Sequence, residues 1–143
     1  MYIKLQNVDL SGLDIHGNEL SQSSTANSYV VTQAGNYSIP VVYGNGIKNG
    51  ATNSAAYTRQ GSTYTAEFVN HLGNTITSPY IHLNTNCTPT SAGLLWQTAS
   101  NMITSISLAQ YNNKYFIEFT VNSIPTTNGL AVVYVKDSSN NIM

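Results

Sequence analysis

The chain has 143 residues, of which only 8% are Asp, Glu, Lys or Arg, and its formal net charge is −1. This length accommodates one domain with a hydrophobic core. The five basic residues are scattered, so they form no basic stripe that could neutralise a nucleic-acid backbone. No apolar run approaches the roughly 20 residues that span a bilayer. We therefore expect neither nucleic-acid binding nor membrane insertion.

The first part of the chain differs in composition from the rest. Residues 1–24 contain Gly, Ser and Asp at short intervals and have little strand propensity after Lys4. We therefore predict an N-terminal arm, residues 1–24, followed by a β-sandwich domain, residues 25–143. The start of the arm alternates polar and apolar side chains and forms a candidate assembly strand. This candidate strand consists of Tyr2, Ile3, Lys4, Leu5 and Gln6.

Apolar and β-branched clusters separated by Gly- and Asn-containing turns predict an all-β fold without helical periodicity. In the segment 114–121, alternating apolar positions define one core-facing side. Pro40 has no N–H to donate, so its strand is expected to lie at a sheet edge or to be interrupted there. The repeated short strands predict an antiparallel β-sandwich. The predicted strands are 28–33, 36–43, 63–69, 93–97, 102–109, 114–121 and 130–137.

Residues 44–63 form a long span without a predicted strand. A connection of about twenty residues inside a compact domain is usually functional or mobile. This segment is rich in Asn and is flanked by Tyr, so we expect it to make surface contacts through amides, hydroxyls and aromatic rings. The candidate contact residues are Tyr43, Asn45, Asn49, Asn53, Tyr57 and Tyr64. Trp96 has two leucines before it and is expected to lie in the core.

Four segments carry a resemblance to a known family. They are TANSYVVTQAGNYSIPVVYGNGIKNG (25–50), AAYT (55–58), FVNHLGNTITSPYI (68–81) and GLLWQTA (93–99). Together they resemble a surface-protein module of Bacteroidetes that occurs in fimbrillin-like exported proteins. The resemblance implies an immunoglobulin-like β-sandwich used in cell-surface proteins, often in fimbriae, and it brings no catalytic residues. A related module carried by a phage that infects such bacteria is an alternative origin.

The residue types that support catalysis or metal binding are not arranged in known motifs. The histidines are His16, His71 and His82, and none has a metal-ligand spacing. Cys87 lies in a polar segment with no base placed beside it by the sequence, and Glu67 and Glu118 occupy alternating strand positions. Asn70 and Gly73 are expected to shape a turn, with the amide bonding to nearby backbone groups. We expect no enzyme activity, no metal and no cofactor.

These observations favour a non-enzymatic structural or adhesion module of an exposed fibre, outside the cell on a bacterial appendage or on a virion. The resemblance leads us to expect a further strand after residue 137. A neighbouring subunit, including another copy of this chain, could supply it through residues 1–6. In the alternative, polar residues 138–141 simply end a monomeric fold. Glycan binding by exposed tyrosines and amides is the main alternative function, and a small hydrolase is a weaker one.

Overall fold

The computed structural model describes residues 8–11, 24–58 and 68–143, and strands dominate its regular structure. The largest sheet has four strands in the order β1-β2-β7-β6. Strand β1 runs parallel to β2, and the other neighbours are antiparallel. These strands are β1 Val8–Asp9, β2 Gly35–Pro40, β6 Ile103–Tyr111 and β7 Lys114–Val121.

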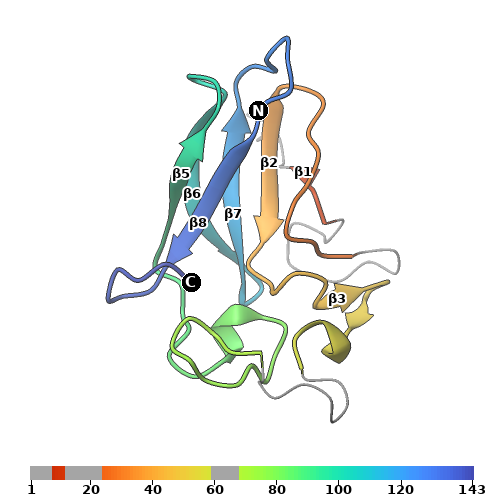
Figure 1. Cartoon of the computed structure of the whole chain (residues 1–143), viewed down its shortest axis with the longest axis vertical. Helices are drawn as coiled ribbons and strands as arrows, with labels where there is room; N and C mark the ends of the chain where they lie inside the picture. The colour runs from red at the N-terminus through yellow and green to blue at the C-terminus, as the bar shows by residue number, and fades with distance from the viewer. Residues whose placement is uncertain (1–7, 12–23, 59–67) are drawn as a thin grey trace, which may run out of the picture.

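A second, two-stranded antiparallel sheet consists of β5 Ser91–Gln97 and β8 Ala131–Lys136. Figure 1 shows β5 and β8 lying across β6 and β7, so the described strands form two layers. A short hairpin, β3 Ile47–Lys48 and β4 Ala51–Thr52, lies apart from both sheets. Two 3-10 helices complete the elements of the described residues: η1 Ser54–Ala56 and η2 Ile81–Leu83.

The core fills the space between the two layers. Ile117, Phe119 and Val121 on β7 pack in one cluster with Val135 on β8, and each is less than 10% exposed. This confirms the core-facing side predicted for the segment 114–121, because alternate residues of a strand point to the same face. Phe116 points to the opposite face and is only 1% exposed, so that face is covered at this position as well.

The predicted strands from residue 93 onward are confirmed, with boundaries shifted by one or two residues. The strand predicted at 28–33 is wrong, because these residues form no ladder and Val30 is 87% exposed. On its side away from β7, β2 pairs with β1 at Tyr37 and Ser38. Strand β2 ends at Pro40, as expected for a residue without an N–H. Most of the strand predicted at 63–69 lies outside the described residues.

Part of the predicted N-terminal arm contributes to the main sheet. Val8 and Asp9 pair with Tyr37 and Ser38 of β2, and the N–H of Leu10 donates to the carbonyl of Ser38 at 3.0 Å. Residues 8–11 therefore join the β domain, whereas the rest of the arm up to residue 23 lies outside the described residues. The all-β, predominantly antiparallel architecture that the sequence predicts is confirmed.

Residues 70–84 are held by asparagine side chains. Asn70 Oδ1 accepts the N–H groups of Leu72 and Asn74, and Gly73 has a positive φ of 80°, so the predicted turn is confirmed. Asn84 is 4% exposed and plays the same role for the residues before η2. Its Oδ1 accepts the N–H of Thr77, and its Nδ2 donates to three backbone carbonyls.

The described residues contain no helix that is long and apolar enough to cross a membrane.

Candidate functional site

The predicted contact residues do not form one exposed surface. Asn45 and Asn49 are exposed beside the β3–β4 hairpin, and Asn49 adopts a positive φ of 50°. Asn53 Nδ2 donates to the carbonyl of Asn45 at 3.1 Å, which is an internal contact of the loop. Tyr57 is only 5% exposed, so its expected role in surface contact is wrong.

The other predicted site residues are Tyr43, Tyr64 and the candidate assembly strand. Tyr43 packs against the core cluster, and burial raises the pKa of its hydroxyl to about 12, with a further contribution from nearby Cys87. Tyr64 lies outside the described residues. The candidate assembly strand, residues 2–6, also lies outside them, so its role stays a prediction.

One edge of β8 faces away from its ladder partner β5. The carbonyls of Leu130 and Lys136 accept N–H groups from Thr98 and Thr90, on the side of β5. The backbone N–H and C=O groups of successive residues point to opposite edges of an antiparallel strand. The odd-numbered residues of β8 therefore direct their N–H and C=O groups to the edge that faces away from β5. These residues are Ala131, Val133 and Val135. Among the described strands, β8 has a ladder partner only in β5.

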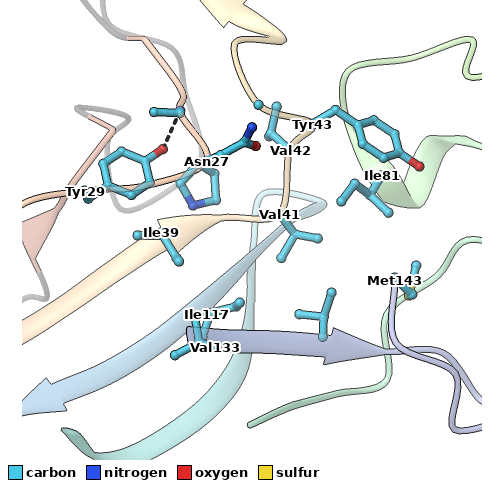
Figure 2. Close-up of a pocket in the computed structure, with 14 residues that line it drawn as sticks. Asn27, Tyr29, Ile39, Val41, Val42, Tyr43, Ile81, Ile117, Val133 and Met143 are labelled. Atoms are coloured by element: carbon cyan, nitrogen blue, oxygen red, sulfur yellow. Dashed lines mark hydrogen bonds between the residues drawn. The ribbon is translucent and has the colours of Figure 1, made fainter. Parts of the chain in front are cut away.

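An open groove runs beside this edge, where the two layers separate. Its volume is about 330 Å³, and Figure 2 shows Ile39, Val41, Ile117, Val133 and Met143 around it. We call this the β8 groove. None of the described residues that line it is charged. Asn27, Tyr29 and Tyr43 form the polar part of its lining. The β8 groove therefore places an apolar surface directly beside an edge of β8 that no ladder of the described strands covers.

The opposite side of the β5–β8 sheet faces solvent and carries exposed apolar residues. We define this outer face by Leu95, Trp96, Leu130 and Val132, each at least 36% exposed. Trp96 is 46% exposed, so the prediction that it lies in the core is wrong. The ladder is irregular between Leu94 and Trp96, and Trp96 pairs with Val132, which points outward. This bulge places Trp96 on the outer face, since one extra residue reverses the side to which a strand residue points.

Tyr134 extends the outer face across the sheet. A Cβ added at Gly93 would lie 2.6 Å from the Tyr134 hydroxyl, so the tyrosine ring rests directly on the glycine. The ammonium of Lys136 lies 5.2 Å from the centre of the same ring. Any side chain at position 93 would displace this ring from the sheet.

The structure brings together three reactive residue types that the sequence does not connect. His71 Nε2 donates to Asp137 Oδ2 at 2.9 Å, and His71 Nδ1 lies 3.9 Å from Cys87 Sγ. The sequence places no base beside Cys87, whereas the fold brings His71 to its side. A carboxylate, an imidazole and a thiol in this order have the connectivity of a nucleophilic triad.

The environment of this cluster favours a structural role. Cys87 is 0% exposed, and its thiol donates to the carbonyl of Thr85 at 3.4 Å. Burial, together with the Asp137 carboxylate, raises the pKa of the Cys87 thiol. A nucleophilic cysteine requires the opposite shift and access to a substrate. The His71–Asp137 contact instead ties residues 68–76 to the end of β8.

The other candidate catalytic or metal-binding residues are not part of this cluster. His82 packs against Tyr115 with ring centres 5.0 Å apart, and burial lowers its pKa. His16 and Glu67 lie outside the described residues. Within the described ranges, no group of three or more His, Cys, Asp or Glu side chains is arranged to hold a metal ion. Glu118 accepts a hydrogen bond from the Tyr111 hydroxyl.

Comparisons with known proteins do not assign this chain to a family. A scan against protein-family models found no match, and searches of curated proteins and of solved structures found none either. The resemblance to fimbrillin-like modules therefore stays a prediction.

Proposed function

We propose that this protein is a non-enzymatic structural or adhesion module of an exposed fibre, built as an immunoglobulin-like β-sandwich. It works outside the cell, on a bacterial surface appendage or on a virion, and joins other protein subunits, including copies of itself. One observation carries this proposal: the edge of β8 opens onto the apolar β8 groove. Unpaired strand edges readily accept a further strand.

The expected mode of assembly is strand addition. An extended segment beside β8 forms main-chain hydrogen bonds with Val133 and its neighbours, and its inward side chains enter the β8 groove. Residues 1–6 of a neighbouring copy have the required alternation, because Ile3 and Leu5 share one face and Lys4 points to the other. The single charged side chain of this segment then faces solvent, which suits a groove without charged side chains.

Analytical ultracentrifugation of matched variants tests this proposal. Val133→Asp introduces a charge into the β8 groove, whereas Val132→Asp introduces the same charge on the outer face of the same strand. We expect Val133→Asp and a deletion of residues 1–6 each to weaken assembly by about tenfold or more, as loss of a few contacts does. Val132→Asp should assemble like the parent chain. A parent chain that stays monomeric at high concentration would show the proposal to be wrong.

Glycan binding is a second candidate function, favoured by the exposed ring of Trp96 on the outer face. An indole face offers a large, rigid apolar surface on which a sugar ring can stack. If this function holds, a neutral glycan raises the melting temperature of the protein and quenches its tryptophan fluorescence. Trp96→Ala then removes the rise in melting temperature, whereas a screen without any stabilising glycan contradicts this function.

A further inference from the structure

The segment that follows β8 already occupies one end of its open edge. The N–H of Met143 donates to the carbonyl of Val135 at 3.1 Å, and Ile142 forms an antiparallel bridge with Lys136. Figure 1 shows this segment turning back at the lower end of β8. Residues 142–143 thus act as a very short strand on the side of β8 that faces away from β5.

The side chain of Met143 enters the same apolar space that an added strand would fill. It lines the β8 groove together with Ile81 and Val135, at the end away from Ile39 in Figure 2. Ile142 points elsewhere and is 49% exposed. Residues 142–143 therefore show what this site binds: an extended backbone antiparallel to β8, with an uncharged apolar side chain directed inward.

A turn centred on Asp137 holds this segment in place. Asp137 Oδ1 accepts the N–H groups of Ser139 and Asn141, each at 2.9 Å. The N–H of Asp137 donates to the carbonyl of Asn141 at 3.0 Å, and Asn140 adopts a positive φ of 68°. Beyond this turn, a single backbone hydrogen bond and the Met143 side chain keep residues 142–143 on the edge. Such an attachment is weak enough for another strand to replace.

A partner strand and residues 142–143 compete for the same backbone group. The open edge offers the outward groups of Ala131, Val133 and Val135, and the Val135 carbonyl is taken by Met143. A strand that pairs along the whole edge needs all three residues, since hydrogen-bonded positions recur at every second residue. It can gain the Val135 position only when Met143 leaves.

We propose that residues 142–143 occupy the strand-addition site of β8 in cis, and that an extended apolar segment of a second copy displaces them when subunits join. This inference rests on the proposed function. It adds a competition within each subunit that limits assembly until the segment is released. The incoming segment requires apolar residues at alternating positions, and one of them replaces Met143 beside Ile81.

A peptide-binding experiment tests this competition in the full-length chain. The probe is a labelled peptide with the sequence of residues 1–8, MYIKLQNV, and its control carries Asp in place of Ile3 and Leu5. Met143→Gly removes the side chain that holds the segment. Ser139→Ala alters only an exposed turn side chain and keeps the N–H that Asp137 accepts. Thermal unfolding first verifies that both variants are folded.

We expect the probe to bind Met143→Gly about tenfold more tightly than the parent, the change expected for loss of one competing hydrogen bond and part of a buried side chain. Self-association measured by ultracentrifugation should increase in parallel, and Ser139→Ala should match the parent in both measurements.

Equal binding and equal self-association of the parent and Met143→Gly would overturn the competition. If Val133→Asp still abolishes binding in that case, strand addition itself stands. If Val133→Asp changes neither binding nor self-association in either background, the proposed function fails.

Discussion

Strands β7 and β8 are both rich in apolar residues but have different surroundings. Strand β7 has the sequence KYFIEFTV and β8 the sequence AVVYVK. Strand β7 is paired with β2 on one side and β6 on the other, whereas β8 has a ladder partner only in β5 among the described strands. The inward residues Ile117, Phe119 and Val121 of β7 are buried, whereas on β8 Val135 is buried and Val133 is only partly buried beside the β8 groove. The number of neighbours, not the strand pattern, separates a core strand from a strand available for contact.

Phe119→Ala in β7 should give the largest effect on stability. The ring is 7% exposed and stacks on Tyr37 with centres 6.1 Å apart, so its removal leaves a cavity in the core. We expect the free energy of unfolding to fall by about 3 to 5 kcal/mol, as for other buried phenylalanines. Urea unfolding followed by circular dichroism measures this change. A loss below about 1 kcal/mol would contradict the assignment of β7 as the central core strand.

The turn at the end of β8 should make stability depend on pH. Hydrogen bonds from the Asn141 and Ser139 backbone, the Asn141 side chain and His71 lower the pKa of Asp137 to about 2. Because the folded-state pKa lies below the unfolded value of about 3.9, this contribution is present above pH 4 and is lost as the pH falls towards 2. Asp137→Asn should weaken this pH dependence, measured by thermal unfolding between pH 2 and 5. An identical pH profile for the variant would show that Asp137 is not the group responsible.

Val133→Ala in β8 should cost less than Phe119→Ala and act mainly on assembly. Its side chain is only partly buried and lines the β8 groove, so we expect a loss of about 1 kcal/mol in the free energy of unfolding. Urea unfolding and ultracentrifugation, performed on the same samples, separate the two effects. A loss as large as that of Phe119→Ala would show that β8 belongs to the core in the same way as β7.

Trp96→Ala should have the smallest effect on stability, within about 1 kcal/mol, because the side chain is 46% exposed on the outer face. The fluorescence of the folded parent should already have the emission maximum of a solvent-exposed indole. Trp96 is the only tryptophan, so this signal reports one position. A blue-shifted maximum in the monomer would instead place the indole in an apolar environment.

Local sequence patterns predicted most strands from residue 93 onward but failed where neighbours decide the outcome. The alternation in 114–121 correctly predicts which side of β7 is buried. The segment 28–33 has comparable strand propensity, yet it forms no ladder, and β2 pairs instead with β1 and β7. A bulge between Leu94 and Trp96 reverses the side of the sheet to which Trp96 points, and no local sequence pattern predicts this bulge.

The candidate site depends even more on contacts between distant residues. Residues 142–143 follow the polar segment 138–141, but their place on the β8 edge depends on how this segment turns around Asp137. His71 and Asp137 are 66 positions apart, and His71 and Cys87 are 16 apart, so their spacing matches no known motif. Turn chemistry around Asn70 was predictable because an asparagine side chain bonds to backbone groups two to four residues away.

The sequence by itself determined the all-β class, the core-facing side of β7 and the turn at Asn70 and Gly73, because each depends on a residue and its near neighbours in the chain. Only the tertiary structure decided that β8 has a free edge, that an apolar groove opens beside it, and that Met143 occupies one end. These features depend on which strands pair and on how the two layers cover one another. Pairing brings together segments that are far apart in sequence, and a local pattern carries no information about which partner is present.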